Sequence, residues 1–392
     1  MRRITMLRAV AGAAVLGWSS LAAAQQDDST GKWVDLNALV STRYTYSFDQ
    51  PLNDRITARV VDTKDNTFSL DTATLFVSRD EEDENFGFGV ALDFGDAASA
   101  YATQRENPGS RRGSEGFDGS DDFELREAFV TYDLPVAGIT VKAGKFATLL
   151  GYEVMKTNTN FNHNISHSIL FGFAIPFTHT GVLLSAPITD LISFDIGVVN
   201  GWDNLDDNNS GKSVLAGVGF EPLEVISFYL AGAYGAERDP QEGNATVAQS
   251  GAGSKRGTMT LNTVITATDQ LSFVLDAVYG HESDLVVAPA RTEDAYWYGF
   301  GAYALFDLDQ YWSFALRSEI FDDDGLRGSF GPVGERVTIW EITPTVSFRL
   351  NDYVMVRAEY RHDEASDKVF AKDNGRSQRG WDTLAGEILV GF

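Results

Sequence analysis

The chain of 392 residues carries 31 basic and 56 acidic side chains, five histidines and no cysteine. Its formal net charge of −25 disfavours nucleic-acid binding, which requires a basic face. The lack of cysteine excludes a disulfide framework, a thiolate metal site and a lipid-anchoring cysteine. Solubility of exposed loops explains the acidity more simply than a role in selecting ions.

The first 24 residues are typical of a secretory signal peptide, with a basic start, an apolar stretch from Ala9 and small residues before the expected cleavage site. The apolar stretch is too short for a stable membrane span. We expect export to the periplasm and cleavage after Ala24, which leaves a single domain, residues 25–392. With 28 basic and 56 acidic residues, this mature chain has a net charge of −28.

Two early segments of the mature chain show the two-residue period of a β-strand with unlike faces. In residues 34–49, apolar and aromatic side chains alternate with polar ones, and only Leu39 breaks the polar parity. In residues 86–95, large apolar side chains alternate with glycine, alanine and aspartate. Soluble antiparallel sheets also alternate, so the prediction of a transmembrane β-barrel depends on the number of strands and on the chain ends.

Short and long connections alternate between the predicted strands. The seven short connections lie near residues 79–84, 135–138, 187–190, 221–224, 267–270, 307–310 and 350–352. The eight long ones lie near residues 49–65, 96–122, 147–177, 200–212, 236–256, 281–294, 322–335 and 362–380. This pattern predicts an all-β barrel of about sixteen antiparallel strands with short periplasmic turns and long external loops. The least distinct strands, near 66–78, 123–134 and 224–235, leave fourteen as an alternative.

Aromatic residues gather at both ends of the predicted strands, as expected for belts at the lipid headgroups. At short-turn ends these are Trp33, Trp312 and Phe348, and at long-loop ends Tyr46, Phe48, Tyr279, Tyr296, Tyr298 and Trp381. The last alternating segment ends at Phe392. A terminal aromatic on such a strand resembles the insertion signal of bacterial outer-membrane barrels, so we expect the barrel-assembly machinery and outer-membrane lipid as partners.

Sixteen strands leave an aqueous lumen, so the polar parity should line a water-filled channel. The predicted lining carries both signs of charge, which indicates a transverse field rather than a funnel of one sign. Its basic members are Arg43, Arg126, Lys142, Arg317, Arg349, Arg357 and Arg361. Its acidic members are Asp35, Asp93, Glu127, Asp195, Asp276, Glu319, Glu341, Glu359 and Glu387. Mutual compensation between side chains at two-residue spacing is the simplest role for several of them.

The connection at 147–177 is too rich in leucine, phenylalanine and isoleucine for a loop in water. Such a loop must bury its apolar surface, and the nearest shelter is the barrel interior. We therefore predict a constriction loop folded into the lumen; packing on a neighbouring subunit is the alternative. Its candidate pore-lining groups are Glu153, Lys156, Asn158, Asn160, Asn162, His163 and His167.

Several motifs in the middle of the chain resemble a known family. They are Gly144-Lys145-Phe146, Gly151-Tyr152-Glu153, the asparagine-rich 158–164, Pro176 to Val182, and Asn200-Gly201-Trp202-Asp203. Together they resemble the β-barrel porin family of the OmpL-like type. The resemblance implies a Gram-negative outer-membrane porin for passive diffusion of small hydrophilic solutes or ions, with no cofactor and no catalytic residue to transfer. By analogy with sixteen-stranded porins, a homotrimer is the candidate assembly.

Two other functional classes stay open. Outer-membrane lipases are also barrels and use serine, histidine and a polar orienting group. Ser166 and Ser168 lie near His163 and His167, but nothing marks a nucleophile elbow, so we do not expect an enzyme. A structural or adhesive barrel is the second alternative, which the shortness of the loops disfavours. No metal site is expected, because the acidic residues near 203–209 do not match the spacing of a calcium loop.

Overall fold

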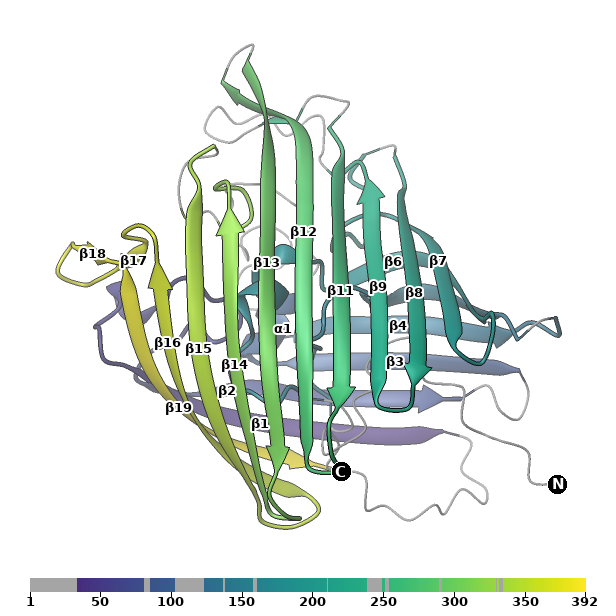
Figure 1. The fold of residues 1–392 in the computed structure, drawn as a ribbon, viewed down its shortest axis with the longest axis horizontal. Helices are drawn as coiled ribbons and strands as arrows, with labels where there is room; N and C mark the ends of the chain where they lie inside the picture. Colours follow the sequence, from purple (N-terminus) through teal and green to yellow (C-terminus); the bar gives the residue numbers. More distant parts are fainter. Residues whose placement is uncertain are drawn as a thin grey trace.

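The computed structural model describes residues 34–80, 85–102, 123–136, 138–157, 161–209, 211–237, 249–250, 254–288, 291–328, 330 and 334–392. Within them, sixteen antiparallel strands form a closed barrel (Figure 1). Successive strands pair with one another, and β1 pairs with β19, which closes the sheet. The prediction of sixteen strands is confirmed, and the fourteen-stranded alternative is excluded.

The strand bounds agree with most of the predicted segments. They are β1 (Asp35–Ser47), β2 (Thr67–Arg79), β3 (Phe86–Phe94), β4 (Phe123–Asp133), β5 (Thr140–Ala147), β6 (Thr178–Pro187), β7 (Ile192–Val199), β8 (Ser213–Leu223), β9 (Ile226–Gly235), β11 (Arg256–Thr266), β12 (Leu271–Ala288), β13 (Arg291–Asp307), β14 (Trp312–Asp323), β15 (Val337–Arg349), β16 (Val354–Ala365) and β19 (Gly380–Gly391). The three least distinct predicted strands are present as β2, β4 and β9.

Short elements occupy the long connections. The two-residue strand β10 (Gln249–Ser250) pairs with β12. The strand β17 (Phe370–Ala371) pairs with β18 (Ser377–Gln378). The helical elements are a 3₁₀ turn at Leu52–Asp54, α1 (Asp96–Tyr101) and the π-turn η2 (Leu170–Ala174). Among the described residues, no helix has the length and apolar character to span a membrane.

One predicted long loop is wrong. The sequence predicts a connection at 281–294, but β12 continues to Ala288 and β13 begins at Arg291, so that the two strands form the tallest hairpin of the barrel (Figure 1). Cross-strand pairs such as Leu285 with Glu293 continue the ladder beyond the neighbouring strands. The polar sequence of this segment predicts a loop. The two strands can nevertheless pair there, because their backbone hydrogen bonds do not require an apolar side-chain face.

The two faces of the strands separate as the alternation predicts. In β3, Gly89, Ala91 and Asp93 are buried on the inner side, whereas Phe86 and Phe94 are exposed on the outer side. Of the predicted aromatic belt, Trp312 and Phe348 contact each other with ring centroids 4.5 Å apart. The placement of Trp381 in the belt is wrong: its side chain belongs to the inward parity and is fully buried beside Phe370.

A β-bulge in β4 turns two consecutive charged residues inward. Ala91 of β3 pairs with Glu127 and Leu92 pairs with Leu125, so Arg126 has no partner opposite it. A bulge of this kind lets adjacent side chains lie on one face of a strand. Both predicted lining residues, Arg126 and Glu127, can therefore point into the barrel, which strict alternation would forbid.

Candidate functional site

The connection between β5 and β6, residues 148–177, is hereafter called the lumen segment; its described residues, 148–157 and 161–177, lie inside the barrel (Figure 1). Its π-turn η2 packs against β12 and β13. Its apolar side chains, among them Leu150, Phe171 and Ile175, are buried in the largest core cluster. The apolar surface that could not stay in water is therefore covered by the barrel wall and the other connections.

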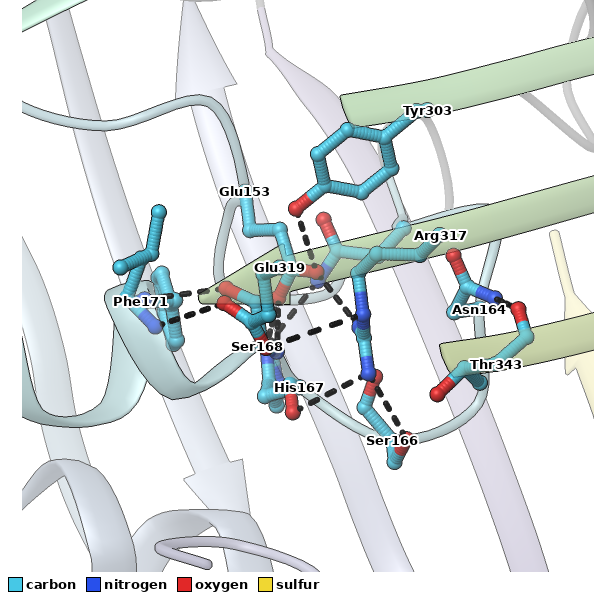
Figure 2. A network of polar contacts seen from close by, with 12 residues as sticks. Glu153, Asn164, Ser166, His167, Ser168, Phe171, Tyr303, Arg317, Glu319 and Thr343 are labelled. Atoms are coloured by element: carbon cyan, nitrogen blue, oxygen red, sulfur yellow. Dashed lines mark hydrogen bonds and ion pairs between the residues drawn. The ribbon is translucent and has the colours of Figure 1, made fainter. Parts of the chain in front are cut away.

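Arg317 of β14 is the centre of the polar contacts between the wall and the lumen segment (Figure 2). Its Nη1 donates to Glu153 Oε1 over 2.8 Å and to the carbonyl of Ser166 over 2.7 Å. Its Nε donates to Glu341 Oε1 of β15 over 3.0 Å. The Tyr303 hydroxyl donates to the same Glu153 oxygen over 3.2 Å. A planar guanidinium with several fixed donors can bind a carboxylate and a carbonyl at once, and a lysine could not match this geometry.

Two carboxylates of the wall hold consecutive backbone N–H groups of the lumen segment. Glu319 accepts from Ile169 over 2.5 Å and from Leu170 over 3.0 Å. Glu359 accepts from Ile165 over 2.6 Å and from Ser166 over 3.0 Å. Charge-assisted bonds of this kind satisfy backbone groups that a buried loop would otherwise leave without partners.

His167 connects the lumen segment to α1. Its Nδ1 lies 3.0 Å from Glu153 Oε2, and its Nε2 lies 2.7 Å from the Tyr101 hydroxyl oxygen. Its ring stacks on Phe171 at 4.4 Å between centroids. Burial alone would raise the pKa of Glu153, but the charge of Arg317 and the hydrogen bond from His167 outweigh it and lower the pKa to about 2. Glu153 is therefore ionised at neutral pH.

A second ion-pair cluster holds the segment near the β1–β19 closure. Lys156 Nζ lies 2.7 Å from Asp71 Oδ2 and 2.8 Å from Glu387 Oε1. Asp71 also pairs with Arg43, and Glu387 accepts from Arg357 Nε over 2.5 Å. Each acid is thus shared between two bases, which compensates the buried charges on both sides. Asp71 is a contributor that the sequence analysis missed.

The single apolar residue on the inner face of β1 has a partner in the lumen segment. Leu39 is buried with Phe161 of the segment and with Met355 and Leu389 of β16 and β19. The exception to the polar parity therefore marks an apolar contact between wall and segment.

Another connection, between β1 and β2, also reaches the inner wall. Arg59 donates to Asp62 over 2.7 Å, to Asp363 of β16 over 2.9 Å and to Thr383 of β19 over 2.8 Å. Burial alone would raise the pKa of Asp62, but the charge of Arg59 outweighs it and holds the pKa below its usual range. The sequence analysis did not single out Arg59 or Asp62, because the partners on β16 and β19 lie about 300 residues away in the chain.

The connection between β14 and β15 supplies an arginine that covers the π-turn. Arg327 lies over the Trp202 ring at 4.2 Å and near the Trp297 ring at 5.6 Å. Its Nε donates to the carbonyl of Phe173 over 3.0 Å. Trp297 Nε1 donates to the next carbonyl, that of Ala174, over 3.0 Å. Cation–π contacts and backbone bonds thus fix the tip of the lumen segment from the long-loop side.

A cavity of about 530 Å³ lies at the short-turn end of the barrel, along the strands from β2 to β8. It reaches inward to Phe129, Lys142 and Asp195. Its outer rim includes residues of the short turns, such as Gly138 and Asp190. The space at this end can therefore admit small molecules, whereas the lumen segment lies deeper in the barrel, where it contacts Asp71 of β2, Arg126 of β4 and Arg317 of β14.

A comparison with known protein families identifies the family of this barrel. The family model described as "Putative beta-barrel porin-2, OmpL-like" matches residues 34–392. The chain belongs to this family. The protein is accordingly an outer-membrane porin, and the resemblance stated from the sequence motifs is confirmed. A comparison with curated proteins gave no match.

Solved structures with the same fold are also porins and outer-membrane proteins. The anion-selective porin from Comamonas acidovorans is 10% identical at a TM-score of 0.58, over 92% of this porin and 99% of that chain. The channel DcaP of Acinetobacter baumannii is 11% identical at 0.58, over 92% and 97%. The trimer form of OmpT of Vibrio cholerae is 12% identical at 0.57, over 92% and 99%. At these identities the likeness concerns the fold alone.

The candidate residues of the porin fall into three groups. Most are buried at the contact between wall and lumen segment: Arg43, Asp93, Arg126, Glu153, Lys156, Asn162, His167, Arg317, Glu319, Arg357, Glu359 and Arg361. Lys142 and His163 are half-buried, and Lys142 lines the cavity. Asn158 and Asn160 lie outside the described residues. The buried candidates bind one another or the loop backbone, and a role in lining a passage stays a prediction for all of them.

The polar side chains considered for the lipase alternative are also engaged in the segment. The Ser166 hydroxyl accepts from Arg317 Nη2 over 3.1 Å and from Arg361 Nη1 over 3.3 Å. The Ser168 hydroxyl accepts from the Phe171 N–H over 3.0 Å. In the described part of the porin, no group of three or more potential ligands could hold a metal ion.

The C-terminal Phe392 lies where β19 meets β1, and its N–H donates to the Ala38 carbonyl over 2.9 Å. Its side chain is exposed on the outside of the barrel. Recognition of this residue by the assembly machinery and cleavage after Ala24 stay predictions; residues 1–24 lie outside the described residues.

Proposed function

We propose that this porin admits small hydrophilic solutes or ions by passive diffusion and that the lumen segment is the constriction that sets the width of the passage. The observation that supports this proposal is the set of buried contacts between the segment and the inner wall. Arg317, Glu319 and Glu359 hold it from β14 and β16, and Lys156 reaches Asp71 and Glu387 on β2 and β19.

These contacts give the segment a fixed position. Removing one partner of a buried ion pair leaves an uncompensated charge, so each pair opposes displacement of the segment. A loop fixed to the wall at several points would leave a passage of constant width beside it. The cavity along β2 to β8 lies at the short-turn end of the barrel, next to the part of the segment that Asp71 of β2 and Arg126 of β4 contact.

We further propose that the mature porin is one domain, residues 25–392, and that it assembles as a homotrimer. The solved trimer form of OmpT, which shares the fold, supports this assembly. Mass measurement of the detergent-solubilised porin without heating should give three times the mass of one chain. The mass of a single chain would contradict the trimer and leave the channel proposal intact.

Planar-bilayer recording tests the passage and the constriction together. The purified porin should give stepwise conductance, and deletion of residues 158–164 should increase the size of each step. That deletion removes Phe161 from its apolar contact and Asn164 from its 2.7 Å bond to Thr345. Deletion of residues 241–247, of equal length in the β9–β11 connection, is the matched control and should leave the step size unchanged.

Two results would contradict the proposal. A barrel that shows heat-dependent gel mobility, and is therefore folded, but gives no conductance would not be a diffusion channel. Unchanged conductance after deletion of residues 158–164 would mean that the lumen segment does not limit the passage.

A further inference from the structure

The charged residues around the short-turn cavity are unequal in sign. Two basic side chains line it, against five acidic ones, which is a formal balance of −3. These residues are Arg79, Lys142, Asp80, Asp133, Asp190, Asp195 and Glu221. The contact zone of the lumen segment differs, because its acids and bases pair with one another.

Three of the acidic charges have no cationic partner in the described part of the chain. Asp195, at the inner end of the cavity, accepts from the Ser185 hydroxyl over 2.5 Å and from the Tyr229 hydroxyl over 2.8 Å. Neutral donors orient this carboxylate without cancelling its charge. Asp190, in the turn between β6 and β7, and Glu221, near the short-turn end of β8, take part in no described ion pair.

One basic charge in the cavity is also uncompensated. Lys142 Nζ lies 4.6 Å from the centroid of the Phe129 ring, a cation–π contact at the inner end of the cavity. Lys142 forms no ion pair with a described residue. Its charge therefore opposes that of Asp195, Asp190 and Glu221 within the same cavity.

We propose that this cavity is a cation-concentrating vestibule that makes the porin pass small cations in preference to anions. Asp190, Asp195 and Glu221 set the preference, and Lys142 limits it. The proposal rests on the proposed passage through the barrel. A hollow with low-dielectric walls and one excess sign of charge focuses its field and raises the local concentration of the opposite ion.

The expected preference depends on salt. The Debye length is about 10 Å at 0.1 M and about 3 Å at 1 M, so uncompensated charges act across a cavity of this size only in dilute salt. The potassium-to-chloride permeability ratio should therefore exceed one in a gradient near 0.1 M and fall toward one near 1 M.

The reversal potential of the porin in a planar bilayer with a potassium chloride gradient tests the assignment. The double variant Asp190→Asn, Glu221→Gln should lower the permeability ratio about twofold or more at low salt, because it removes two of the uncompensated charges. Lys142→Gln should raise the ratio. Asp269→Asn removes one charge from another turn at the same end, outside the cavity lining, and should leave the ratio unchanged.

Three results would overturn the inference while leaving the porin a channel. These are a wild-type ratio at or below one in dilute salt, a ratio insensitive to the double variant, and an equal shift in Asp269→Asn, which would assign the effect to general surface charge. Absence of any conductance from the folded wild type would instead contradict the proposed function itself.

Discussion

Arg317 and Glu153 form a buried ion pair across the lumen, with Nη1 and Oε1 2.8 Å apart, although 164 residues separate them in the sequence. One belongs to a barrel strand and the other to the lumen segment. Both side chains are almost completely buried. The pair therefore joins the barrel wall to the lumen segment without contact with solvent. This contact is one of several that hold the segment against the wall.

Arg317→Ala should destabilise the porin by about 3–5 kcal/mol in free energy of unfolding, because Glu153 and Glu341 lose their buried cation. Urea unfolding in detergent measures this change. Arg336→Ala is the matched control: Arg336 is exposed to solvent and pairs with Asp322 and Asp324, so its loss should change the free energy of unfolding far less. Equal effects of the two variants would contradict the importance of the buried pair.

Glu319→Ala should expose two backbone groups of the lumen segment to exchange. The N–H groups of Ile169 and Leu170 would lose their acceptor, so their hydrogen exchange should accelerate about tenfold or more. Mass-spectrometric exchange on the peptide that contains the π-turn measures the effect. Glu364→Ala, on the outward parity of β16, should leave that peptide unchanged. Unaltered exchange in Glu319→Ala would show that the carboxylate does not hold the segment.

Acid should weaken the contact of Glu153 with Arg317, which holds the lumen segment, within a defined pH range. The pKa of Glu153, about 2 in the folded porin, lies below its ordinary value of 4.5, so the folded state favours the ionised form. The resulting stabilisation is complete above about pH 4.5 and is lost as the pH falls from there toward 2. Stability of wild type and Glu153→Gln, compared over that range, should converge on acidification. A constant difference down to pH 2 would exclude Glu153 as the titrating group.

Gly144→Ala should impair folding. Gly144 has φ of +132°, and a Cβ there would lie 2.2 Å from the Ala128 carbonyl oxygen. Backbone strain and this clash should cost about 2–4 kcal/mol, visible as a reduced yield of heat-modifiable barrel. Gly386→Ala is the control, since its nearest contact, the Arg357 carbonyl oxygen, is 4.0 Å away. A normal yield for Gly144→Ala would contradict the steric requirement.

Much of the fold could be predicted from the local alternation of apolar and polar residues along each strand. Alternation with a period of two is local, because successive side chains of a strand point to opposite faces whatever their partners are. Hence β3, with phenylalanine outside and glycine inside, and the sixteen strands follow from the sequence. The error at 281–294 has the same origin: where a hairpin extends beyond the neighbouring strands it needs no apolar face, so its polar sequence does not differ from that of a loop.

The sequence by itself determined which face of each strand is polar, and that the lumen segment is too apolar to remain in water. Only the tertiary structure decided what the inner charges do. Arg317, Lys156 and Glu359 were candidates for lining the passage; in the folded porin they bind the lumen segment, whereas Lys142 and Asp195 border the cavity. Parity places a side chain inside the barrel, but its partner comes from a connection far away in the chain. Whether a charge meets water or a counter-charge is therefore fixed only when the segment folds into the lumen.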